Sequence, residues 1–138
     1  MRTVPNANQP YESVDAALLN AWLRMINTSA YRALLEVLNA ARIDGKLRLR
    51  ISAELLAWGK NLDQQSLSIY QSSDEQLASP QGDAQVIMLL NMTRSFMRGL
   101  LTQEQYGVSP EETLTYVGKW IELIAPLLKL RRASIQVR

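Results

Sequence analysis

The sequence contains no cysteine and no histidine among its 138 residues. Their absence excludes a disulfide framework, a thiolate nucleophile, an imidazole base and a zinc site of the usual Cys/His kind. The closely spaced carboxylates of Glu111 and Glu112 are explained by the dipole of a helix that begins there, and those of Asp74 and Glu75 by solvation in a loop. A glycine-rich phosphate loop and a serine elbow are also lacking. We therefore expect no enzyme, no metal and no cofactor.

Long hydrophobic runs and a strong excess of one charge are missing as well. The chain has 15 Lys and Arg against 13 Asp and Glu, a net charge of +2. Because the acids are spread along the whole chain, we expect no surface dedicated to nucleic acid or to an anionic membrane. The nearly uncharged stretches 84–93 and 123–128 are far shorter than the roughly 18 to 20 residues of a membrane span. Residues 1–10 lack the apolar run of a secretion signal, so we expect a cytoplasmic protein.

Hydrophobic residues make up 47% of the chain and recur at helical spacing, which predicts an all-α fold of five or six helices. We expect an extended lead-in over 1–12, a helical domain over 13–130 and a basic tail over 131–138. The predicted helices span 14–26, 30–42, 46–70, 83–105 and 110–130. The number depends on whether 46–70 is broken near Ser52 or Gly59, and Pro126 is expected to kink the last helix. No stretch alternates with period two, so no strand is expected, and 71–82 has the composition of a mobile connection.

Several helix ends carry local signals. Ser13 is suited to cap the first helix, and Gly107 stands where a left-handed residue would end the fourth. The segment Ser109-Pro110-Glu111-Glu112 combines an N-cap serine, a proline at the first helical position and a glutamate at the third. These residues predict a sharp start for the fifth helix.

The last two helices have apolar residues over arcs of roughly 200°, whereas a surface helix of a small monomer needs a stripe only somewhat wider than about 100°. We therefore expect one part of each arc to be covered by the domain itself and another by a second copy. Two helices from each subunit would then form a four-helix bundle about a two-fold axis. The predicted dimer interface comprises Leu89, Leu100, Tyr116, Trp120, Ile124, Leu127 and Leu128. The alternative is that the fourth helix is simply the central helix of the domain, wrapped by the others.

Aromatic residues and methionines on the core-directed arcs of four helices predict a cavity for a hydrophobic or aromatic small molecule. The candidate ligand-binding residues are Trp22, Tyr31, Leu35, Trp58, Met88, Met92 and Phe96. Ordinary core packing is the alternative for each of them. Arg94 and Arg98 are four residues apart on the polar edge of the fourth helix and are suited to clamp an anion or a partner's carboxylate, unless they are simply solvated.

One internal segment has the spacing of a helix-turn-helix. Ala41, Gly45 and Ile51 occupy the characteristic relative positions, with four Lys and Arg residues nearby. The second helix, however, continues as a long amphipathic stripe that suits a core better than a DNA groove. We interpret its cations as a solvated face.

The segment 29–47, SAYRALLEVLNAARIDGKL, resembles a stretch of tetracycline-repressor (TetR) family regulators, in which a Tyr-Arg-x-Leu-Leu-Glu helix leads into Ala-Ala-Arg and an acidic turn. A long helix, a loose connection, an apolar penultimate helix and a last helix begun by Pro-Glu-Glu follow in the same order. Together they are similar to the C-terminal ligand-binding and dimerisation domain of that family, over roughly residues 13–130.

The resemblance implies a homodimeric sensor in which a small molecule enters between the helices, shifts the first helix and alters the spacing of two DNA-reading heads. Family members read DNA with a helix-turn-helix region that would precede Ser13, and this chain has no room for it there. We therefore expect DNA contact only through a region absent from this chain, and the sequence leaves open whether the relative is naturally shortened. The alternative function is a helical adaptor that grips another protein with the same apolar helices.

Overall fold

The structure, a computed structural model, describes residues 2–5 and 11–135, with side chains described over 11–131. The elements in chain order are β1 (Arg2–Pro5), α1 (Val14–Asn20), the π-helical segment η1 (Ala21–Ile26), α2 (Ser29–Ile43), α3 (Gly45–Ile69), β2 (Tyr70–Ser72), α4 (Ser79–Gln105), α5 (Pro110–Ile124), the 3₁₀ turn η2 (Ala125–Leu127), β3 (Leu128–Leu130) and β4 (Arg132–Ile135). The described part is mostly helical, which confirms the predicted class. The first predicted helix continues from α1 into η1, and α3 is unbroken.

The helices begin and end where side chains and glycine satisfy the free backbone groups. Ser13 accepts a hydrogen bond from the backbone N–H of Ala16 at 3.1 Å, and Ser109 accepts one from Glu112 at the same distance. Gly107 follows α4 with φ +98°, the left-handed conformation expected there. The predicted start of α4 at Asp83 is wrong, because the helix already begins at Ser79, where Pro80 fits its first turn.

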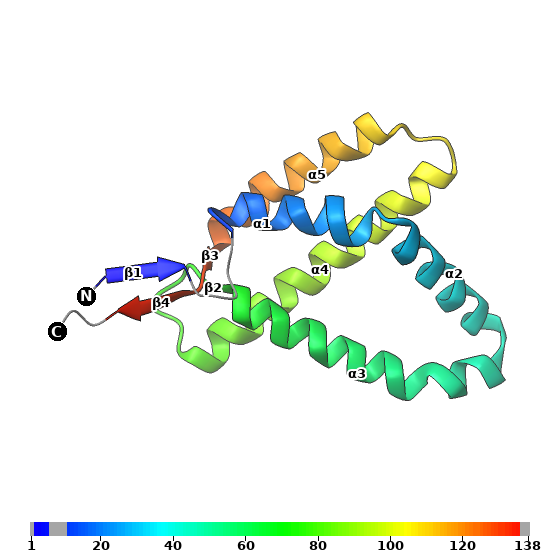
Figure 1. Cartoon of the computed structure of the whole chain (residues 1–138), viewed down its shortest axis with the longest axis horizontal. Coiled ribbons are helices and arrows are strands. Elements are labelled where there is room, and N and C mark those ends of the chain that lie inside the picture. Colours follow the sequence, from blue (N-terminus) through cyan, green and yellow to red (C-terminus); the bar gives the residue numbers. More distant parts are fainter. Residues whose placement is uncertain (1, 6–10, 136–138) are drawn as a thin grey trace.

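α4 is the central helix of the protomer. It contacts α3 and α5, and α1 packs against α5. α2 lies at the end of the molecule far from the termini (Figure 1). The interior between these helices is filled by large side chains that are almost completely buried, among them Leu18, Trp22, Met97, Leu101 and Val117. α4 therefore lies at the centre of the protomer, but the other helices do not cover it completely, because Met88 and Met92 remain exposed.

Two short strand pairs correct the expectation that the chain has no strand. β2 pairs antiparallel with β3, with Tyr70 opposite Leu130, and β1 pairs antiparallel with β4. The predicted helix up to Leu130 is therefore wrong as well. α5 ends at Ile124, Pro126 lies in η2, and the chain then extends so that Leu128 and Leu130 are buried. The proline lacks a backbone donor and crowds the preceding turn, so it ends the helix here instead of kinking it.

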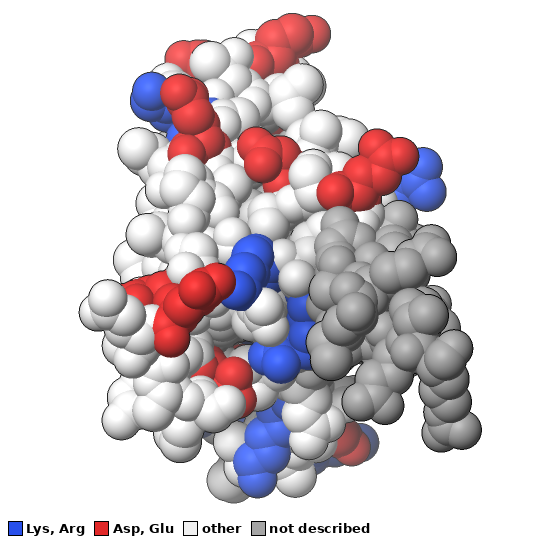
Figure 2. Space-filling model, turned by 90° about the vertical axis from the view of Figure 1, so that its left-hand side faces the viewer, with Lys and Arg blue, Asp and Glu red and all other residues white. Residues whose placement is uncertain are grey.

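The pairing of β1 with β4 joins the predicted lead-in to the predicted tail. Residues 1 and 6–10 of the lead-in and 136–138 of the tail lie outside the described residues. Charges of both signs are interspersed at this end of the molecule, over a largely uncharged surface (Figure 2). Lys129 pairs with Glu75 at 3.3 Å and Arg131 with Asp83 at 3.6 Å. Among the described helices, none combines the length and hydropathy that crossing a membrane would require.

A polar cluster joins the helices at the opposite end. The Arg32 guanidinium of α2 lies 3.2 Å from Glu104 of α4, and the Thr113 hydroxyl of α5 donates to the other oxygen of the same carboxylate at 2.6 Å. Glu104 is largely buried, so this charge-assisted contact is shielded from water more than a surface ion pair. One carboxylate thus connects three helices.

Candidate ligand pocket

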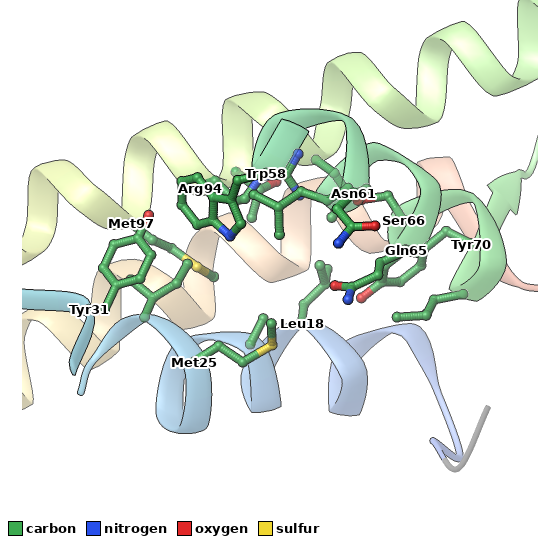
Figure 3. A pocket seen from close by; sticks show the side chains of 16 residues that line it. Leu18, Met25, Tyr31, Trp58, Asn61, Gln65, Ser66, Tyr70, Arg94 and Met97 are labelled. Atoms are coloured by element: carbon green, nitrogen blue, oxygen red, sulfur yellow. The ribbon is translucent and has the colours of Figure 1, made fainter. Parts of the chain in front are cut away.

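A cavity of about 310 Å³ lies between α1 with η1 on one side and α3 with α4 on the other, and Tyr31 of α2 closes one end (Figure 3). Its lining residues are Leu18, Ala21, Met25, Ile26, Tyr31, Trp58, Asn61, Leu62, Gln65, Ser66, Ile69, Tyr70, Leu90, Thr93, Arg94 and Met97. The volume is at the lower end of the roughly 300 to 1,000 Å³ range of small-molecule sites, and the lining has the usual mixture of many apolar groups and a few polar ones.

The lining follows from helical periodicity in two elements. In α3, Trp58, Leu62, Gln65 and Ile69 are spaced by four, three and four residues, so one side of the helix faces the cavity. In α4 the same spacing brings Leu90, Arg94 and Met97 to the opposite wall. The π-helical turns of η1 bring Met25 and Ile26 to the wall formed by the first helix.

Arg94 is the only charged residue of that lining. Only 13% of its side chain is exposed, and its Nη2 donates to Asn91 Oδ1 at 2.9 Å and lies 3.5 Å from Asp63 Oδ1. Nη1 donates to the hydroxyl of Ser66 at 3.3 Å. Burial lowers the pKa of Arg94, Asp63 opposes this change, and the nearby positive charge of Arg98 adds to it. The site therefore holds a charge that its surroundings solvate incompletely.

Two tyrosines border the cavity in their neutral form. Burial raises the pKa of Tyr31, while the charges of Arg98 and Arg94 and a hydrogen bond with Arg98 act in the opposite direction. Burial also raises the pKa of Tyr70, well above its ordinary value. Both phenols stay protonated at neutral pH, so they are available as hydrogen-bond donors.

The structure brings only part of the predicted ligand set to this cavity. Tyr31 and Trp58 line it, with their rings 6.5 Å apart. Trp22 is buried in the core instead, and Leu35 borders a separate hollow with Arg98 and Thr102. The remaining three, Met88, Met92 and Phe96, lie outside the lining on another side of α4.

Most of the α3 wall of the cavity, and Tyr70, are not predicted from the sequence. Leu62, Gln65, Ser66 and Ile69 are ordinary helix residues whose only signal is that they share a face with Trp58. The amphipathic stripe of this helix predicts only a core-directed face, because a cavity leaves no trace in hydrophobic periodicity. Tyr70 falls in a strand that was not expected.

The predicted dimer residues divide into two groups. Leu89, Leu100, Ile124 and Leu128 are buried within the protomer, where they contact their own chain. Tyr116 and Leu127 are exposed. Trp120 is half-buried: its ring stacks on Phe96 with centroids 4.8 Å apart, and its Nε1 donates to the Thr93 hydroxyl at 3.0 Å.

α4 and α5 also present an uncovered apolar surface. We call it the α4–α5 face; it consists of Met88, Met92, Phe96, Tyr116, Trp120, Leu123 and Leu127. Met88 is 54% exposed and Leu123 is 59% exposed. The three residues in α4 are four apart, those from α5 into η2 are spaced by four, three and four, and the Phe96–Trp120 stack joins the two rows. Part of both predicted arcs therefore remains unburied in a single chain.

No protein-family model, curated protein or solved structure matches this chain. The resemblance to TetR regulators rests on the residues of the sequence alone.

Proposed function

We propose that this chain is the small-molecule-sensing, dimerising domain of a cytoplasmic TetR-like transcriptional regulator. The observation that carries the proposal is the cavity between η1, α3 and α4, which is lined by aromatic and aliphatic side chains together with a few polar groups. Such a lining suits an apolar or aromatic molecule that is oriented by a small number of hydrogen bonds.

The position of the cavity supports a regulatory role. Leu18, Met25 and Ile26 of α1 and η1 form one wall, so a ligand contacts the first helix directly (Figure 3). In the family that the sequence resembles, this helix leads to the DNA-reading region. A ligand shifts an equilibrium between two arrangements only if it binds one of them more tightly, so the sensor must prefer one position of the first helix.

The alternative is a helical adaptor that uses the α4–α5 face to grip another protein. The exposed apolar residues of that face support it as well as they support a homodimer. An adaptor, however, gives no role to the cavity on the other side of α4.

Filling the cavity tests the sensor function. We expect naphthalene- and decyl-based compounds to raise the melting temperature of the native chain, because a ligand that binds only the folded state stabilises it. Leu62→Trp places a larger side chain into the cavity and should abolish this shift. Leu56→Trp makes the same substitution on an exposed position of the same helix and should retain it. Equal shifts in both variants, measured by differential scanning fluorimetry, would contradict a ligand site here.

A further inference from the structure

We infer that the ligand of this pocket is an anion, an apolar or aromatic molecule that carries one carboxylate, and that Arg94 binds the carboxylate. The inference rests on the proposed ligand-sensing function and adds the charge class of the ligand.

The first observation is an excess of positive charge at one end of an otherwise uncharged cavity. Arg94 lines the pocket, and Arg98 lies close enough for its charge to act on both Arg94 and Tyr31. Asp63 is the one described carboxylate within ion-pair distance of Arg94, and it is about one-third exposed. Arg98 borders the separate hollow together with the exposed Glu36, and it forms no ion pair with a described carboxylate. The cavity lining thus contains one cation and no carboxylate, and Arg98 adds positive charge nearby.

The second observation is that the guanidinium group of Arg94 has donors to spare. An arginine side chain offers five N–H donors. Arg94 uses its Nη atoms toward Ser66, Asn91 and Asp63, while its Nε is buried and finds no acceptor among the described residues. The two Nη atoms of Arg94 carry four N–H groups for the three described partners, so a guanidinium N–H remains for a carboxylate in the cavity, which accepts with a short, strong bond.

The surroundings complete a site of two parts. Tyr31 lines the cavity with Arg94, and its protonated hydroxyl is a hydrogen-bond donor of the kind that a carboxylate oxygen accepts. The remaining wall is apolar, with Trp58, Leu62 and Met97 available to the body of the molecule (Figure 3). A cationic ligand would meet like charge here, and a neutral one would leave the positive excess unbalanced.

Acid, amide and amine head groups on each of two scaffolds test the charge of the ligand. The probes are 2-naphthylacetic acid, its amide and 2-(2-naphthyl)ethylamine, together with decanoate, decanamide and decylamine, titrated calorimetrically into the full chain. We expect each acid to bind at least tenfold tighter than its amide, and each amine to bind more weakly than the amide. An amide or an amine that binds as tightly as its acid overturns the inference and leaves the proposed sensor intact. If none of the six binds, the sensor function fails, and the inference fails with it.

Substitutions then locate the carboxylate. Arg94→Gln should bring the acid-to-amide ratio close to one while the affinity for the amide changes less than about threefold. Arg50→Gln removes the same charge from an exposed position of α3 and should leave the ratio unchanged. Asp63→Asn removes the competing carboxylate and should tighten the acids further. Weaker binding of the acids by Asp63→Asn would show that Arg94 serves only its internal ion pair, and would overturn the inference.

Discussion

Thr93 joins the two C-terminal helices through a single hydroxyl group. The hydroxyl donates to the carbonyl of Leu89 one turn earlier at 2.7 Å and accepts from Trp120 Nε1 at 3.0 Å. A buried indole N–H needs such an acceptor, and the same bond fixes the ring that stacks on Phe96. One small polar residue thus sets the orientation of the aromatic pair at the centre of the α4–α5 face.

At this residue we expect Thr93→Val to lower the free energy of unfolding by about 1 to 2 kcal/mol, because the substitution preserves shape but leaves the Trp120 N–H without its acceptor. Thr115 is the control: its hydroxyl makes the equivalent bond to the carbonyl of Glu111 at 3.0 Å, but it is exposed. Thr115→Val should change stability by less than about 0.5 kcal/mol. Urea unfolding followed by circular dichroism measures the free energy of unfolding of both variants. Equal decreases in the two variants would contradict a stabilising role of the hydrogen bond to Trp120.

The turn between α4 and α5 is determined locally, unlike most of the contacts between the helices. Gly107 has φ +98°, and the backbone N–H groups of Gly107 and Val108 bond to carbonyls of the last turn of α4 at 3.1 Å each. Pro110 then starts α5 immediately. This short connection makes the two helices antiparallel neighbours, so the apolar rows on each of them lie beside one another.

For this element we expect Gly107→Ala to lower the free energy of unfolding by about 1 to 2 kcal/mol, because a side chain is strained at positive φ. Gly118 lies exposed in the middle of α5, where alanine favours the helix, and no atom lies within 4 Å of an added Cβ. Gly118→Ala should raise stability by about 0.5 to 1 kcal/mol. Opposite signs in urea unfolding are the expected result, and a stabilising Gly107→Ala would contradict the turn.

At the scale of the whole molecule, the α4–α5 face remains exposed in a single chain, and the proposed dimer would use this surface. The homodimer that the last helices suggest would bury the face against a second copy, as a four-helix bundle. Ile124 and Leu128 are unsuitable probes of this dimer, because they are only 6% and 4% exposed and a charge there would disrupt the protomer itself. The exposed residues of the face are the informative ones.

At this scale we expect the native chain to be a dimer by light scattering and Leu123→Glu to convert it to a folded monomer, since the substitution buries an unpaired charge in the interface at a cost of several kcal/mol. Leu49→Glu introduces the same charge at a position of α3 that is 80% exposed and should stay dimeric. A dimer that survives Leu123→Glu would place the interface elsewhere. A monomeric native chain that pairs only with another protein would favour the adaptor.

What the sequence determined by itself is local. Helix class, the caps at Ser13 and Ser109 and the left-handed Gly107 were predictable, because each depends on side-chain spacing or on a few neighbouring residues. Helical periodicity also predicts that α4 and α5 carry more apolar surface than one chain covers. It does not distinguish the residues that pack inside the protomer from those that remain exposed. Leu89 and Leu100 were assigned to a partner, yet they pack inside the protomer, while Met88 and Met92 were assigned to a ligand and lie outside.

Only the tertiary structure decided where the hydrophobic faces meet and where they leave a gap. The strand pair of β2 and β3 brings Tyr70 opposite Leu130 across sixty residues of chain, a pairing that no local pattern encodes. The cavity likewise depends on tertiary packing, because its lining comes from α1, η1, α2, α3 and α4. Arg94 becomes a largely buried cation only once Ser66 and Asp63 of α3 lie beside it. Periodicity fixes which side of each helix is apolar, whereas burial and charge balance depend on contacts made after the helices have packed.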